Sequence, residues 1–180
     1  MSAVKETIGA REIFAELYEE YMPKVYRHIY YRVNNSHVAE DLTSTVFEKA
    51  LTNFGRFTTD KASFSTWIFS IARNVVIDHY RIQGRRRVVS LEESTVDIQI
   101  ASGDLSPEEE VTKSEERKRL QSCLAKLSRD DQELISLKFG AELNNRQIAK
   151  TLGLSESNVG TRLYRAVRKL RDSFQEPVNG

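Results

Sequence analysis

Apolar residues recur every three or four positions through most of the chain, the spacing of one face of an α-helix. Such stripes run through residues 11–33, 37–54 and 63–84, and they resume after residue 105. The only stretch that approaches the period-two alternation of a strand is Val96–Ala101. The pattern therefore predicts an all-α protein.

Local residues predict where the helices of the first half bend, begin and end. Pro23 interrupts the first stripe and predicts a kink or a break. Asn34 and Asn35 are turn residues, and Ser36 is the expected N-cap of the second helix. Gly84 and the three arginines after it are expected to end the third helix. The second helix is expected to turn these residues inward: Val38, Leu42, Val46 and Leu51.

The middle of the chain divides it into two helical blocks. Val88–Gly103 has no sustained periodicity, so we expect an extended or mobile linker. Ser106, Pro107 and Glu109 then form the capping-box pattern that starts a helix. Ser128 is expected to open a shorter helix that ends near Gly140. We therefore expect two small helical domains, residues 1–88 and 106–180, joined by an acidic flexible linker at 89–105.

The segment Asn145–Arg171 has the pattern of a helix-turn-helix. Gly153 suits a helix end that needs a positive φ, and Ser155 suits the N-cap of the second helix. One face of that helix is apolar (Val159, Leu163, Ala166, Val167 and Leu170), and the other is basic (Arg162, Arg165, Arg168, Lys169 and Arg171). A helix of this kind fits the DNA major groove. The alternative is an ordinary helical hairpin with a solvated basic face.

The net charge of +1 hides an uneven distribution. Residues 1–88 hold 13 basic and 10 acidic side chains, residues 89–116 hold one and nine, and residues 117–180 hold 13 and seven. Two mildly basic blocks therefore flank an acidic connector. Clustered basic charge on a domain is typical of nucleic-acid contact.

Other features narrow the class of protein. The single cysteine, Cys123, excludes an internal disulfide and a cysteine-rich zinc site. The apolar runs are too short to span a bilayer, and the N-terminus lacks the apolar core of a signal peptide. The sequence thus predicts a cytoplasmic protein without membrane insertion. We find no pattern for a catalytic site, a metal or a cofactor and expect none.

Three stretches together resemble a known family. The family is the extracytoplasmic-function (ECF) class of bacterial RNA polymerase sigma factors. Its second conserved segment resembles residues 37–51, and its −10-reading helix resembles residues 64–81. Its −35-reading helix-turn-helix resembles residues 148–170. The resemblance extends from Phe14 to Leu170. It implies a transcription initiation factor without catalytic activity, which binds core RNA polymerase, recognises duplex promoter DNA and helps melt the −10 element. Members of this class are often held inactive by an anti-sigma factor.

The resemblance also implies roles for residues of the second helix. That helix would dock on the polymerase's largest subunit, and the candidates for this interface are Asp41, Leu42, Thr45 and Phe47. We expect Phe47 to be the exposed aromatic anchor, because binding energy concentrates in a few such residues. A solvated face for Asp41 and a core position for Phe47 are the alternatives.

The third helix and the loop before it would read the −10 element. The residues near bases would be Asn74, Asp78 and His79. Phosphates would be contacted by Arg81, Arg85, Arg86 and Arg87. Phe57 would stack on a flipped base, and Lys61 would contact the backbone. The alternatives are a core position for Phe57 and an Asp78–Arg81 pair that only stabilises the helix.

The helix-turn-helix would read the −35 element. Its candidate residues are Arg146, Lys150, Ser157, Asn158, Thr161, Arg162 and Arg165. Gly160 departs from the family pattern, in which a larger residue is usual. Either the backbone approaches DNA closely there, or one base contact is missing.

Another class of protein fits part of the same pattern. A dimeric regulator would use only the helix-turn-helix and would bind palindromic duplex sites without polymerase. In such a protein the basic end of the third helix would have no special role.

Overall fold

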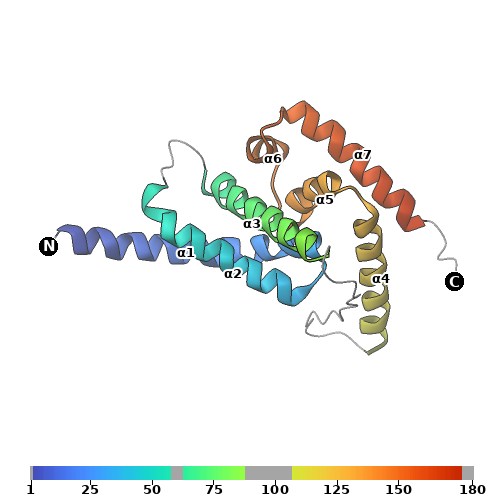
Figure 1. The fold of residues 1–180 in the computed structure, drawn as a ribbon, viewed down its shortest axis with the longest axis horizontal. Coiled ribbons are helices and arrows are strands. Elements are labelled where there is room, and N and C mark those ends of the chain that lie inside the picture. The colour runs from blue at the N-terminus through green and yellow to red at the C-terminus, as the bar shows by residue number, and fades with distance from the viewer. Residues whose placement is uncertain (1, 58–62, 88–106, 176–180) are drawn as a thin grey trace.

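The computed structural model describes residues 2–57, 63–87 and 107–175, and every regular element in these ranges is helical (Figure 1). The first half holds α1 (Ser2–Val33), α2 (Ser36–Asn53), η1 (Phe54–Arg56) and α3 (Phe64–Arg87). The second half holds α4 (Pro107–Lys126), α5 (Arg129–Ile135), η2 (Ser136–Gly140), α6 (Asn145–Leu152) and α7 (Glu156–Gln175). The all-α prediction is confirmed, whereas the linker 89–105, with Ser106 and Lys61, lies outside the described residues.

The first helix does not break at its proline. α1 continues through Pro23, which is exposed, so water can solvate the carbonyl that the missing N–H leaves free. Packing maintains the helix beyond that point, because Val25 and Ile29 are fully buried. Tertiary burial therefore outweighs the local cost of the proline.

One other predicted boundary was wrong. Asn35, not Ser36, is the N-cap of α2: its side chain accepts a hydrogen bond from the Val38 N–H at 3.0 Å. Ser36 is the first residue of the helix and is buried. α3 ends at Arg87, within the predicted end; it continues through Gly84 because an exposed glycine weakens a helix without stopping it.

The inward face of α2 confirms Val46 but not the other three predicted positions. It consists of Ala39, Thr43, Val46, Phe47 and Ala50. Leu51 follows Ala50 by 100° around the helix and is 56% exposed, while Val38 and Leu42 are half-buried. On α7, both Ala166 and Val167 were predicted to face inward; Ala166 is buried, as predicted, and Val167 is 39% exposed.

In the second half, α4 begins at the predicted residue and α5 has the predicted N-cap. Pro107 begins α4, and Ser128 caps α5 by accepting a hydrogen bond from the Asp131 N–H. α5 then widens into a single π-helical turn, η2, that ends at Gly140. The sequence predicted a helix ending there but not the π turn, which is a feature often found at functional sites.

The two halves share one hydrophobic core. A single cluster of buried side chains contains Val25, Ile29 and Phe69 from the first half and Leu137 and Ile148 from the second. Among the described residues, a small second cluster, built around Leu124, Leu127, Ile135 and Ala166, belongs to the second half alone. Figure 1 shows α5 between α3 on one side and α4 and α7 on the other. The contact between the halves is therefore a packed interface.

Candidate nucleic-acid interface

The helix-turn-helix is built as its sequence predicts. Asn144 and Gln147 form a reciprocal capping box at the start of α6. Gly153 ends α6 in the left-handed conformation, with φ of 67°. Ser155 then accepts a hydrogen bond from the Asn158 N–H and caps α7. Both helices keep their apolar faces inward, since Ile148 and Val159 are fully buried.

Gly153 gives a direct stability prediction. Gly153→Ala should destabilise the protein by about 1–2 kcal/mol, because a side chain is strained at positive φ even in open space. Gly84→Ala is the matched control: Gly84 lies within α3 with nothing near its missing Cβ, so alanine there should stabilise by about 0.5–1 kcal/mol. Urea unfolding measures both, and equal effects would contradict the role of the turn.

The candidate −35 residues lie outside the core. Ser157, Asn158, Thr161 and Arg165 are exposed on α7, and Arg146 and Lys150 are exposed on α6. Arg162 is half-buried because its guanidinium donates to the Asp130 carboxylate on α5 at 3.1 Å. The N-terminal half of α7 therefore offers an uncovered polar and basic surface, with one arginine already paired within the chain.

Gly160 is not required by packing. A Cβ there would meet only the Asn145 amide nitrogen, at an ordinary contact distance of 3.6 Å. No close approach inside the protein therefore explains the glycine.

The candidate −10 residues of α3 differ in exposure: Asn74 and Arg81 are exposed, and Asp78 and His79 are half-buried. Asn74 is exposed, and it lines a groove of about 310 Å³ with Lys49, Asn53, Arg56, Trp67 and Ile71. Asp78 pairs with Arg81 at 3.1 Å, as the helix-stabilising alternative predicted. His79 is half-buried, and burial lowers its pKa, so the ring is neutral at pH 7. Arg85 and Arg86 lie in the last turn of α3.

Phe57 lies among other aromatic side chains. Its ring is 4.9 Å from Trp67, 5.6 Å from Phe64 and 6.1 Å from Phe54, measured between centroids. The side chain is half-buried against the core. This packing favours the structural role for Phe57 over the stacking role.

The candidate polymerase residues of α2 divide into two groups. Asp41 is exposed, while Leu42 and Thr45 are half-buried, with the Thr45 hydroxyl donating to the Asp41 carbonyl. Phe47 is only 6% exposed and packs edge-on against Tyr18 of α1, with 4.7 Å between centroids. The expectation of an exposed Phe47 was therefore wrong, because α1 covers that side of α2.

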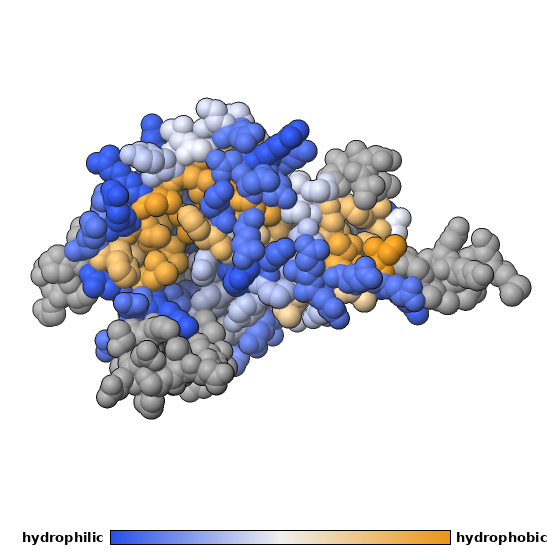
Figure 2. Space-filling view, turned by 180° about the vertical axis from the view of Figure 1, so that it is seen from behind, coloured by the Kyte–Doolittle hydropathy of each residue, from blue (hydrophilic) through white to orange (hydrophobic). Residues whose placement is uncertain are grey.

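An apolar groove between α4 and α7 was missed by the sequence analysis. It measures about 630 Å³, and its apolar residues are Leu120, Val167, Leu170 and Phe174. Figure 2 shows apolar areas separated by a hydrophilic band on the face opposite to that of Figure 1. Val167, which is 39% exposed, is one of the residues that this groove leaves open to solvent.

A buried ionic cluster at the contact between the halves was also missed. Glu133 of α5 accepts hydrogen bonds from Arg32 of α1 at 3.1 Å and from Arg73 of α3 at 3.0 Å. The Arg32 and Glu133 side chains are only 4% and 9% exposed. Periodicity could not reveal this cluster, because the three residues come from distant helices.

His28 lies at the same contact and is fully buried. Neither ring nitrogen has a hydrogen-bond partner of good geometry. Burial and, secondarily, the Arg32 charge lower the pKa of His28 from 6.5 to about 3, with the Ser136 backbone opposing. The folded protein therefore binds fewer protons here than the unfolded chain between these two pH values.

This pKa shift predicts a loss of stability on acidification. Well above pH 6.5 His28 is neutral in both the folded and the unfolded chain, so its pKa shift does not affect stability. At pH 5 the shift should lower the free energy of unfolding by about 2 kcal/mol. Unfolding in urea at pH 7 and pH 5 measures the difference. His28→Leu should remove this part of the pH dependence, whereas His37→Leu, at an exposed site, should retain it. Identical pH dependence in the wild type and the His28 variant would contradict the argument.

Comparison with known proteins identifies both halves. Residues 17–86 match the family Sigma-70 region 2, and residues 117–170 match Sigma-70, region 4. None of the helices in the described part of the chain combines the length and apolar content needed to cross a membrane.

Individual relatives agree with the family matches. The ECF RNA polymerase sigma factor SigW of Bacillus subtilis is 30% identical over 175 residues, covering 93% of this chain and 92% of SigW. SigX of the same organism is 31% identical, covering 91% of this chain and 84% of SigX. BldN of Streptomyces coelicolor is 36% identical over 90% of this chain, which spans 60% of the length of BldN.

Solved structures share the fold. The sigma factor RpoE of Bartonella quintana, in complex with the anti-sigma factor NepR, superposes with a TM-score of 0.75 at 20% identity, over 92% of this chain and 99% of RpoE. CnrH, in complex with the cytosolic domain of CnrY, gives 0.65 at 22% identity, over 94% of this chain and 92% of CnrH. With both family regions in order and two relatives matched over most of their length, this chain belongs to the ECF class of RNA polymerase sigma factors.

Proposed function

We propose that this chain binds core RNA polymerase, recognises the −35 and −10 elements of promoters and promotes melting of the −10 element. One observation supports this most directly: an exposed polar and basic helix-turn-helix face occurs on the same chain as α3, a helix that carries the exposed Asn74 and Arg81 and ends in three arginines. Two linked readers raise affinity for a promoter that carries both elements. The domain division at 1–88, 89–105 and 106–180 belongs to this proposal.

Specific roles follow for each reader. The exposed side of α7 reads bases of duplex DNA through Ser157, Asn158, Thr161, Arg162 and Arg165. α6 binds phosphates through Arg146 and Lys150. On α3, Asn74, Asp78 and His79 lie near bases, and Arg81, Arg85 and Arg86 contact phosphates. His79, neutral at pH 7, can both donate and accept a hydrogen bond. Phe57 supports α3 through Trp67.

Core polymerase binding is assigned to the outer face of α2. Asp41 supplies an exposed carboxylate there, and Leu42 and Thr45 lie on the same helix and are partly accessible. Phe47 contributes indirectly by fixing α2 against α1. In an interface of this kind, the charged side chain of Asp41 would contribute more to binding than an aromatic anchor.

The solved complexes of RpoE and CnrH pair each protein with a NepR or CnrY chain. We propose that this chain likewise has an anti-sigma partner and acts in the cytoplasm, where the polymerase is. The apolar groove between α4 and α7 provides a surface to which a helical partner can bind.

Run-off transcription tests the proposal. Purified bacterial core polymerase is incubated with a library of upstream DNA fragments, with and without this protein. Discrete starts that appear only when the protein is added are the expected result, and their upstream sequences give both promoter elements. Absence of starts, together with binding of palindromic duplex sites by the protein alone, would instead establish the dimeric regulator.

A further inference from the structure

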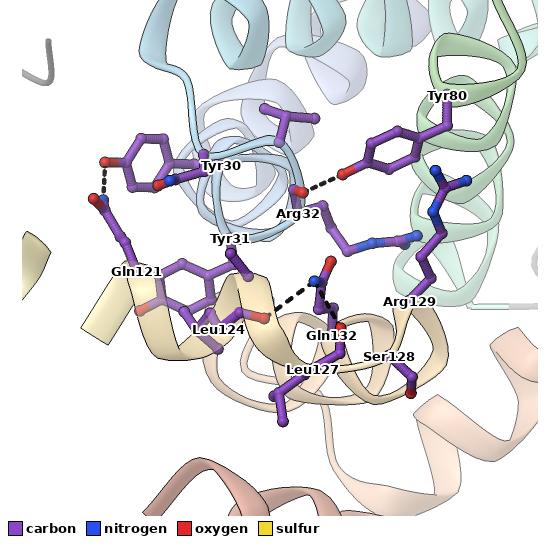
Figure 3. A pocket seen from close by; sticks show the side chains of 13 residues that line it. Tyr30, Tyr31, Arg32, Tyr80, Gln121, Leu124, Leu127, Ser128, Arg129 and Gln132 are labelled. Atoms are coloured by element: carbon purple, nitrogen blue, oxygen red, sulfur yellow. Dashed lines mark hydrogen bonds between the residues drawn. The ribbon is translucent and has the colours of Figure 1, made fainter. Parts of the chain in front are cut away.

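We propose that the polar cavity lined by α1, α3, α4 and α5 is a binding site for a small organic anion that carries a flat ring, a class that includes the nucleoside monophosphates. The cavity measures about 490 Å³ (Figure 3). Small-molecule sites in proteins are about 300–1,000 Å³ in volume. None of the described residues that line the cavity belongs to the proposed DNA or polymerase surfaces, so the inference does not depend on the proposed function.

The walls of the cavity carry positive charge. Of the 13 described residues that line it, Arg32 and Arg129 are cationic, and none is a carboxylate. The carboxylate that Arg32 contacts is that of Glu133, which does not line the cavity and also accepts a hydrogen bond from Arg73. One carboxylate therefore faces two guanidinium groups, and positive charge remains on this wall. Such a cavity attracts an anion.

Arg32 has hydrogen-bond donors in reserve. Its side chain is only 4% exposed, its Nη1 donates to Glu133 at 3.1 Å, and its Nε has no hydrogen-bond partner. A guanidinium has five N–H donors, and a buried donor without an acceptor costs free energy. An anion in the cavity would bring acceptor oxygens to a buried side chain that the protein itself satisfies only in part.

The two cationic side chains meet at Tyr80. The guanidinium carbon of Arg129 lies 4.5 Å from the centre of the Tyr80 ring, and the Tyr80 hydroxyl donates to the Arg32 carbonyl. Figure 3 shows both arginine side chains extending toward this tyrosine. Burial raises the pKa of Tyr80, and the charges of Arg32 and Arg129 both oppose that rise. An anion at this end of the cavity would reach two guanidinium groups, which bind phosphate and carboxylate through paired N–H donors.

The other end of the cavity suits a flat ring with N–H donors. It is formed by Tyr30, Tyr31 and Gln121 (Figure 3), and Tyr31 is half-buried, so part of its ring is uncovered. Planar bases stack on such rings. Gln121 donates through Nε2 to the Tyr30 hydroxyl, and Gln132 donates through Nε2 to two backbone carbonyls near the end of α4. The Oε1 atom of each amide can therefore accept a hydrogen bond from an amino group on the ring.

Isothermal titration calorimetry with the full-length protein tests the assignment. Adenosine monophosphate, AMP, is the probe that combines both chemical features, and it should bind with a Kd of roughly 10–100 μM, as expected for a ligand of its size. Adenosine lacks the anion and inorganic phosphate lacks the ring, so each should bind about tenfold more weakly or less. Benzoate, a ring with a carboxylate, tests whether the anion must be a phosphate.

Two variants locate the bound probe, and a third is the control. Arg129→Gln removes one of the two guanidinium groups at an exposed position and should weaken AMP binding about tenfold. Ala125→Phe keeps both arginines but adds bulk to the cavity wall at an exposed position, and it should weaken binding to a similar extent. Arg168→Gln loses the same charge on α7, outside the cavity, and should bind AMP like the wild type.

The outcomes are distinct. The assignment would be overturned by failure of AMP to bind at about 1 mM, or by an unchanged affinity in both cavity variants. Equal weakening in Arg129→Gln and Arg168→Gln would also overturn it, because AMP would then be attracted by basic charge in general. Phosphate binding as tightly as AMP would remove the ring from the assignment. Benzoate binding as tightly as AMP would support the site and identify a carboxylate as a sufficient anion. Circular dichroism checks the fold, and Arg129→Gln decides alone if Ala125→Phe does not fold.

Discussion

Replacing both Arg162 and Arg165 with alanine is expected to lower transcription from a cognate promoter roughly 100-fold, since two base contacts of about 1–3 kcal/mol each are lost. Both residues lie in the N-terminal half of α7, the part that enters the major groove in helix-turn-helix proteins. Affinity for core polymerase should not change. The measurement is run-off transcription on a promoter selected by the wild type, with polymerase binding measured in parallel.

The matched control for this prediction is Arg168→Ala. Arg168 lies on the same helix, is exposed and faces Asp172 at 3.9 Å, so its removal costs one positive charge, as each single variant does, without removing a proposed base contact. The single variants add information, because Arg162 must leave Asp130 to reach DNA whereas Arg165 is already exposed. The prediction that α7 binds promoter DNA and does not bind polymerase would be contradicted by either of two results. One is an equal loss of transcription in the Arg168 control. The other is an equal loss of polymerase binding and promoter binding in the double variant.

Reversing the charge at Asp41 is expected to have the complementary effect. Asp41→Arg should weaken core polymerase binding about 10- to 100-fold, the usual cost of replacing a central charged contact by a repulsive one. The fold should tolerate the change, because Asp41 is exposed and only its backbone carbonyl accepts a hydrogen bond, from Thr45. Titration of labelled polymerase with each protein measures the loss.

Glu19→Arg is the control for Asp41. It makes the same change in net charge at an exposed position of α1. Unfolding in urea should give similar stabilities for both variants and the wild type. If Asp41→Arg binds polymerase like the wild type, Asp41 does not belong to the interface, and the polymerase must bind elsewhere in the first half.

Residues one position apart on a helix show where sequence reasoning reached its limit. Hydrophobic spacing predicted each helix, but it did not distinguish Leu51 from Ala50 or Val167 from Ala166 as the buried member of the pair. A helix rotates 100° per residue, so the identity of the covering element decides which neighbour is buried. For Phe47 the covering element is α1, through Tyr18. The sequence could not show this, because nothing in the α2 pattern records which neighbour packs on it.

The sequence by itself determined the helical class, the helix-turn-helix with its glycine turn, the caps at Ser128 and Ser155, and the resemblance to sigma factors. These features depend on local propensities and on short-range spacing, so they can be read from neighbouring residues. Only the tertiary structure decided that the two halves share one core, that Glu133 joins Arg32 to Arg73, and that Gly140 touches the backbone of α1. Those contacts join residues about 60 to 113 positions apart, and their energy comes from burial and desolvation that exist only once the helices have packed.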